Sequence, residues 1–183
     1  MKRLIACIAL LSLALTSAMA QPSTAFADKP ALLTSIGQSA DLEMVKVLLT
    51  RARIAFTTDA VIKAADLSGS AKTLILVVGG SSKGLGAAGI SADDEIARAK
   101  ALIKRARELG MKIIAVHVGG EARRGTLSDV FIELCIPAAD YAIVVSDADK
   151  DGLFTRLAAG AKIQLAKVEK ISGAGAPLAA AFK

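Results

Sequence analysis

Two short runs of this sequence are almost continuously apolar, and few folds allow that. Residues 73–79 read TLILVVG, and residues 112–118 read KIIAVHV. A strand with one face in water alternates apolar and polar residues, but these runs do not, so we expect both faces of each strand to be buried. The pattern is typical of a parallel sheet that is covered by helices on each side.

Other apolar or β-branched runs alternate with segments of helical periodicity. The sequence therefore predicts a single three-layer, doubly wound α/β domain with a mostly parallel sheet, either Rossmann-like or flavodoxin-like. We expect strands at 31–35, 53–57, 73–79, 112–118, 141–146 and 163–168, and helices at 42–52, 59–66, 92–109, 127–135, 153–159 and 177–182.

The first 20 residues have the composition of a secretory signal peptide. Two basic residues precede an apolar stretch that ends in the small-residue pattern AMA. We expect cleavage before Gln21, or as late as after Ala27, where a second pair of small residues occurs. Residues 21–30 are then a polar spacer and 31–183 the domain. The mature protein is expected in the periplasm or outside a bacterial cell, without a lasting membrane anchor.

Charge and composition narrow the classes of partner. Without the two basic residues of the signal peptide, 21 basic residues stand against 17 acidic ones, a net charge of +4. The whole chain has five Phe, one Tyr and no Trp to stack on bases, so we do not expect nucleic-acid binding. Cys135 is the one cysteine after the signal peptide, so an intrachain disulfide is excluded. We expect it to be a buried small hydrophobe.

Polar and glycine-rich segments follow four of the expected strands. They are residues 35–39 (SIGQS), 79–91 (GGSSKGLGAAGIS), 119–125 (GGEARRG) and 146–152 (SDADKDG). Ligands of doubly wound domains bind at the carboxyl ends of parallel strands, where the direction of the connections reverses. The four segments are therefore expected to converge on one ligand-binding edge.

The segment 79–91 has glycine spacing similar to that of a dinucleotide-binding turn. It follows the third expected strand rather than the first, the expected helix begins only after Ser91, and no acidic residue ends the next strand. A phosphate-binding Walker loop is excluded as well, because Lys83 precedes Gly84. We therefore expect no nucleotide cofactor.

The preferred hypothesis is that these loops bind a small carboxylate or phosphate without transforming it. Lys83, Arg123 and Arg124 would neutralise the anion, and hydroxyl, amide and backbone groups would orient it. The alternative is that the glycines only permit turns and the cations are solvated. The candidate ligand-binding residues are Ser35, Gln38, Ser39, Ser81, Ser82, Lys83, Gly84, Glu121, Arg123 and Arg124.

The segment 146–152 resembles the first half of a calcium-binding loop. Asp147, Asp149 and Asp151 alternate and a glycine follows, but Ala158 stands where a bidentate glutamate is required. Calcium is thus a candidate ligand if another segment supplies oxygen. The alternative is that Asp149 or Asp151 caps the helix that follows.

Two further functions remain open. A hydrolase or transferase would use Glu121 or His117 as its acid or base, although His117, the only histidine, shares a strand face with Ile113 and Ala115 and is equally expected to be packed. An interaction module would instead dock on an exported or membrane partner.

Several blocks together resemble a bacterial secreted α/β family that is classed as a domain of unknown function. The blocks are LLTSIGQSADLEMVKVL, LILVVGGSSKGLGAAGIS, HVGGEARRGTLSD and DKDGLFTRLA. The resemblance covers nearly the whole mature chain. It implies a single exported domain that carries these loops as its signature, and it brings no established activity or ligand.

Overall fold

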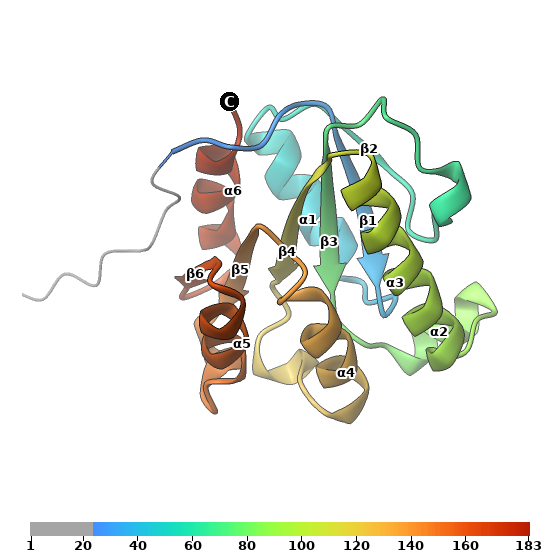
Figure 1. The fold of residues 1–183 in the computed structure, drawn as a ribbon. Helices are drawn as coiled ribbons and strands as arrows, with labels where there is room; N and C mark the ends of the chain where they lie inside the picture. Colours follow the sequence, from blue (N-terminus) through green and yellow to red (C-terminus); the bar gives the residue numbers. More distant parts are fainter. Residues whose placement is uncertain (1–23) are drawn as a thin grey trace, which may run out of the picture.

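The computed structural model describes residues 24–183, so the expected signal peptide and the cleavage site before Gln21 lie outside the described residues. Within the described chain, six strands form one parallel sheet in the order β2-β1-β3-β4-β5-β6 (Figure 1). The predicted doubly wound fold is confirmed, and the strand order is the flavodoxin-like one. The strands are β1 (Ala31–Ile36), β2 (Phe56–Thr58), β3 (Thr73–Val78), β4 (Lys112–His117), β5 (Tyr141–Val145) and β6 (Gln164–Val168).

Helices cover both faces of the sheet, as the two apolar runs predicted. Helices α1 and α6 pack on one face, and α3, α4 and α5 pack on the other (Figure 1). The helices are α1 (Asp41–Arg51), α2 (Ser82–Ala88), α3 (Ala92–Glu108), α4 (Thr126–Cys135), α5 (Leu153–Ala161) and α6 (Gly175–Ala181), and the 3₁₀ turns are η1 (Ala64–Asp66), η2 (Glu121–Arg123), η3 (Ser146–Asp149) and η4 (Ile171–Ala174).

Strand β3 illustrates why the apolar pattern was informative. All six of its residues are buried. Leu74 and Leu76 pack under α3, α4 and α5, whereas Ile75 and Val77 pack under α1 and α6. Each side chain thus enters one of the two helix-covered cores, as is typical of a central parallel strand.

Helix α2 was not expected, because its glycine-rich sequence favours a loop. The side chain of Ser81 caps it by accepting a hydrogen bond from the backbone N–H of Gly84, and Gly89 ends it at a φ of 68°. Helix α3 begins as predicted at the N-cap Ser91, which forms a capping box with Asp94. The hydroxyl and the N–H of Ser91 also lower the pKa of Asp94.

Two expected elements were wrong between β1 and β3. The helix expected at 59–66 is only the turn η1, because the carboxylate of Asp59 accepts a hydrogen bond from the N–H of Val61 and favours a local turn. The strand expected from Arg53 begins at Phe56 instead. Arg53 has a φ of 54° and Ile54 donates to the carbonyl of Leu49, so these residues end α1.

The segment expected to be a spacer is partly structured. Ala27 is fully buried and forms a parallel bridge with Phe182, next to α6. The N–H groups of Phe26 and Ala27 both donate to the carbonyl of Ala181, and Lys183 donates back to Ala27. The first residues of the domain are thereby joined to its last helix.

A chain that begins at Asp28 is therefore expected to be less stable than one that begins at Gln21. It loses three backbone hydrogen bonds and the burial of Ala27, which together are worth about 2 kcal/mol. Urea denaturation of the two chains tests this difference. Equal midpoints would show that the contacts with α6 add nothing to stability.

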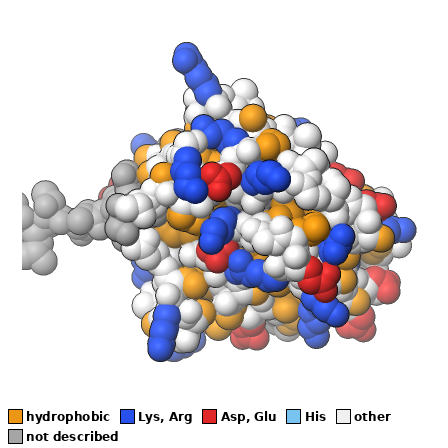
Figure 2. Space-filling view, turned by 45° about the horizontal axis from the view of Figure 1, so that its top comes forward, with side chains coloured by type: hydrophobic (Ala, Val, Ile, Leu, Met, Phe, Trp, Pro, Cys, Tyr) orange, Lys and Arg blue, Asp and Glu red, His pale blue; other side chains and the backbone are white. Residues whose placement is uncertain are grey.

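Within residues 24–183, no helix has the length and apolar character needed to cross a membrane. On the face shown in Figure 2, Lys and Arg side chains stand singly among acidic and apolar ones rather than in one continuous basic stripe.

Candidate functional site

The loops after β1 and β3 lie at the point where the connections diverge to opposite sides of β1. They are tied together by their backbones, because Gly79 donates to the carbonyl of Ile36 and Ser81 donates to that of Gly37. Gln38 and Gly80 add an antiparallel bridge. The backbones of the two loops are therefore joined at the switch point.

Two of the predicted binding residues, Ser39 and Arg123, meet beside these loops. A Cβ atom built on Gly79 would lie 2.9 Å from Cγ of Arg123 and 3.2 Å from Oγ of Ser39. A Cβ on Gly119 would lie 2.4 Å from Cβ of Arg123 and 2.6 Å from Oδ2 of Asp41. Only glycine fits at these two positions, because the stem of Arg123 rests directly on both backbones. We refer to Ser39, Asp41, Gly79, Gly119 and Arg123 as the edge cluster.

The polar groups of the edge cluster are incompletely paired. The Nε atom of Arg123 lies 3.5 Å from Oδ2 of Asp41, and both buried atoms lack a hydrogen-bond partner among the described residues. The Arg123 side chain is 33% exposed. Ser39 is buried, and its Oγ accepts a hydrogen bond from the N–H of Asp41, a bond that does not use the hydroxyl proton.

Arg124 does not join the edge cluster. Its guanidinium donates to Asp129 (2.7 Å) and to Asp151 (2.9 Å), and it also donates to the carbonyl of Ala148. Hydrogen bonds to Asp129 and Asp151 raise the pKa of Arg124. The neighbouring Glu121 is exposed and forms an ion pair with Lys150. The two adjacent arginines therefore form no common clamp in this structure.

The predicted residues at the start of α2 have structural roles or are exposed. Ser81 is the N-cap, and Ser82 and Lys83 are exposed. Gly84 packs closely on the loop after β1, and a Cβ atom at Gly84 would lie 1.9 Å from the carbonyl oxygen of Gln38. Among the described residues, Lys83 has no ion pair with the edge cluster.

Ser35 and Gln38 contact a buried hub that the sequence did not reveal. Glu95 is fully buried and accepts hydrogen bonds from the N–H of Gly37 (2.8 Å), from Nε2 of Gln38 (2.9 Å) and from Nε of Arg98 (2.6 Å). Arg98 also donates to the carbonyl of Ser35 (2.5 Å), whose own Oγ is buried without a partner among the described residues.

Burial by itself would raise the pKa of Glu95. Its hydrogen bonds with Arg98, Gly37 and Gln38 lower the pKa by more than burial raises it, so the pKa is below its ordinary value. Glu95 therefore stays ionised and holds the loop after β1 to α3.

The three aspartates of the expected calcium loop have separate partners. Asp149 accepts hydrogen bonds from the N–H of Phe154 (2.7 Å) and from Oγ1 of Thr155 (2.5 Å). Asp151 accepts a hydrogen bond from the N–H of Leu153. Both carboxylates thus accept hydrogen bonds from N–H groups in the first turn of α5, whose N-cap residue is Gly152. Asp147 accepts instead from the N–H of Glu121. Within residues 24–183, no three carboxylate, thiol or imidazole groups come together in a way that could hold a metal ion.

His117 and Cys135 are both packed in the core. The Nδ1 atom of His117 lies 2.9 Å from the carbonyl oxygen of Val78, and Nε2 lies 3.3 Å from that of Gly120. Burial lowers the pKa of His117, and neither ring nitrogen is open to a substrate. Burial raises the pKa of Cys135 to about 12, so its thiol is unreactive near neutral pH.

Comparison with solved structures finds distant similarities. The psychrotrophic esterase EstA from Pseudoalteromonas sp., inhibited by monoethylphosphonate, is 11% identical with a TM-score of 0.34, over 76% of this chain and 78% of the esterase. A GDSL-like lipase from Bacteroides thetaiotaomicron is 10% identical with a TM-score of 0.34, over 75% of this chain and 66% of the lipase. Similarities at this level assign no activity to this chain.

No curated protein matches the sequence. A family model does match, over residues 28–182, which is almost the whole described chain. Its description, Domain of unknown function (DUF6305), agrees with the resemblance seen in the sequence. The chain belongs to the DUF6305 family.

Proposed function

We propose that this domain binds a small carboxylate or phosphate at the edge cluster and does not transform it. The observation that carries the proposal is the placement of Arg123 at the carboxyl edge of the sheet, with its stem fixed on Gly79 and Gly119. A fixed stem presents the guanidinium at a set position, so a ligand pays little entropy to order it.

The partners of Arg123 favour anion binding. Asp41 faces Nε, which leaves the two Nη groups for the parallel hydrogen bonds that guanidinium makes with carboxylate or phosphate oxygens. Ser39 offers a hydroxyl proton beside them. Helix α1 also begins here, and the N–H groups of its first turn contribute positive potential, against which the carboxylates of Asp41 and Glu43 act.

A binding role is favoured over hydrolysis because the two residues that the sequence offered as acid or base already have other partners. Both ring nitrogens of His117 face backbone carbonyls, and Glu121 is paired with Lys150. We propose in addition that the domain acts after export, which rests on the signal-like sequence of residues 1–20.

Arg123→Ala is expected to weaken the binding of inorganic phosphate, or of a carboxylate from a panel, by more than about tenfold, because a charge-assisted bidentate contact is lost. Arg123→Lys keeps the positive charge but loses the planar guanidinium that makes two parallel hydrogen bonds. Its affinity should therefore lie between those of Arg123→Ala and the unaltered chain. Titration calorimetry measures both.

The matched control is Lys83→Ala, which removes an exposed cation on α2 and should leave the affinity unchanged. If Lys83→Ala weakens binding while Arg123→Ala does not, the ligand binds elsewhere and the proposal fails.

A further inference from the structure

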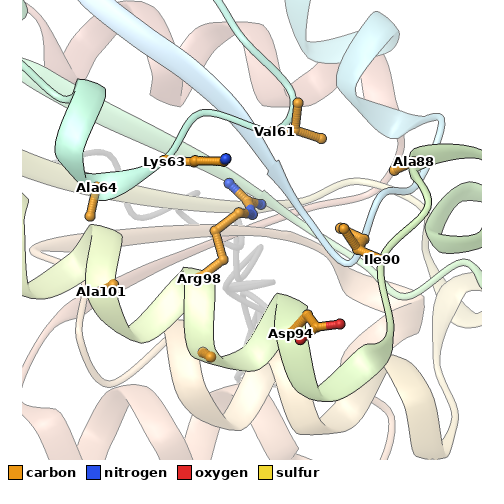
Figure 3. A pocket seen from close by; sticks show the side chains of 9 residues that line it. Val61, Lys63, Ala64, Ala88, Ile90, Asp94, Arg98 and Ala101 are labelled. Carbon is orange, nitrogen blue, oxygen red and sulfur yellow. The ribbon is translucent and has the colours of Figure 1, made fainter.

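A concave site lies away from the edge cluster, beside α3. Its volume is about 510 Å³, within the range of small-molecule pockets. Three segments form its walls (Figure 3): residues 61–64 between β2 and β3, the region from Ala88 to Ile90 after α2, and the outer side of α3 from Asp94 to Ala101. None of its lining residues belongs to the edge cluster.

Most of the wall is apolar. Val61 is 45% exposed, and it lines the pocket together with Ile90. The α3 side is lined by the small residues Ala97 and Ala101, which leave room for an occupant. An apolar group that enters here would bury aliphatic surface that is now in water.

One end of the pocket is cationic. The side chains of Lys63 and Arg98 point toward each other from opposite walls (Figure 3). Arg98 is held in place by Glu95 and by the carbonyls of Ser35 and Ile62. These bonds and a second one to Glu95 use four of its five N–H groups, which leaves one on Nη1.

The uncompensated positive charge at this end is that of Lys63. Glu95 is buried and its carboxylate compensates the charge of Arg98, which can still donate its remaining N–H. At the other end of the pocket, Asp94 accepts hydrogen bonds from the N–H and the hydroxyl of Ser91. Lys63 has no ion pair within residues 24–183, so its ammonium is available to an occupant.

We propose that this pocket binds a small monocarboxylic acid with an aliphatic body. The carboxylate would meet Lys63 and the remaining N–H of Arg98, and the aliphatic body would lie between Val61, Ile90 and Ala97. This site is separate from the edge cluster and does not depend on it.

Three probes of equal chain length test the proposal: hexanoate, 1-hexanol and hexylamine. They are titrated into ¹⁵N-labelled protein while amide shifts are followed. Hexanoate should give saturable shifts at Val61, Ala64, Ala97 and Ala101, and hexylamine should bind at least about tenfold more weakly. Equal binding of the three probes would overturn the assignment of a carboxylate.

Variants locate the contacts. Lys63→Ala should weaken hexanoate by about tenfold and leave 1-hexanol unchanged, because only the charged contact is removed. Ala97→Leu fills the cavity and should abolish both. Lys100→Ala makes the same charge change on α3 outside the pocket and should have no effect. If Lys100→Ala matches Lys63→Ala, or if Arg123→Ala abolishes hexanoate binding, the acid does not bind in this pocket.

Discussion

Glu95→Ala is expected to lower the free energy of unfolding by about 3–5 kcal/mol, the cost of breaking a buried ion pair. The substitution leaves the guanidinium of Arg98 without its carboxylate, and it leaves the N–H of Gly37 without its acceptor. It also removes one of the two acceptors of Nε2 of Gln38, which keeps its hydrogen bond to the carbonyl of Ala60. The loop after β1 loses its connection to α3, so the effect should extend from this loop to the edge cluster.

Urea denaturation of Glu95→Ala beside Glu108→Ala measures the effect. Glu108 lies on the same helix but forms only exposed ion pairs with Lys104 and Arg105, so its loss should cost no more than about 0.5 kcal/mol. A similar small loss at Glu95 would show that the buried hub does not stabilise the fold.

The hub also predicts how stability depends on pH. The pKa of Glu95 is lower in the folded protein than its ordinary value, so its stabilisation is complete above the ordinary value and is lost as the pH falls through the folded one. Asp149 acts in the same direction. Burial by itself would raise the pKa of Asp149, but its hydrogen bonds with Lys167 and Thr155 lower the pKa by more, so the pKa is below its ordinary value. Below about pH 4, Glu95→Gln should therefore lose less stability than the unaltered chain.

Gly84→Ala is expected to destabilise the domain by about 3 kcal/mol, because the added methyl group would lie 1.9 Å from the carbonyl oxygen of Gln38 and force α2 away from the loop. Gly86 lies in the same helix and has nothing within 4 Å of a built Cβ atom. Gly86→Ala should instead stabilise by about 0.5–1 kcal/mol, since alanine favours helix.

Thermal or urea unfolding of the two variants measures both effects. The same substitution, made two positions apart, should change the free energy of unfolding in opposite directions. If both variants are stabilised, α2 does not pack on the loop after β1. If both are destabilised, residues 82–88 are not helical.

The sequence predicted the sheet because strand signals are local. The runs at 73–79 and 112–118 contain the central strands, and their two buried faces require helices on each side. Helix α2 was missed because two of its seven residues, Gly84 and Gly86, have low helix propensity, and its stability comes from packing on Gln38 and from the cap at Ser81.

The candidate site was harder to predict because it depends on the direction in which each side chain points in the folded protein. Arg123 and Arg124 are adjacent in sequence, yet one lies over Gly79 and the other pairs with Asp129 and Asp151. In the sequence, Glu95 is the last of three consecutive acidic residues, and only the fold shows that it is buried. Spacing along the chain does not carry this information.

The central claim is that the edge cluster is an anion site, and an amide-shift titration with inorganic phosphate tests it most directly. With ¹⁵N-labelled protein that begins at Gln21, the account predicts saturable shifts centred on Ser39, Gly79 and Gly119, and their loss in Arg123→Ala. Saturable shifts confined to other residues, or shifts that persist unchanged in Arg123→Ala, would contradict it.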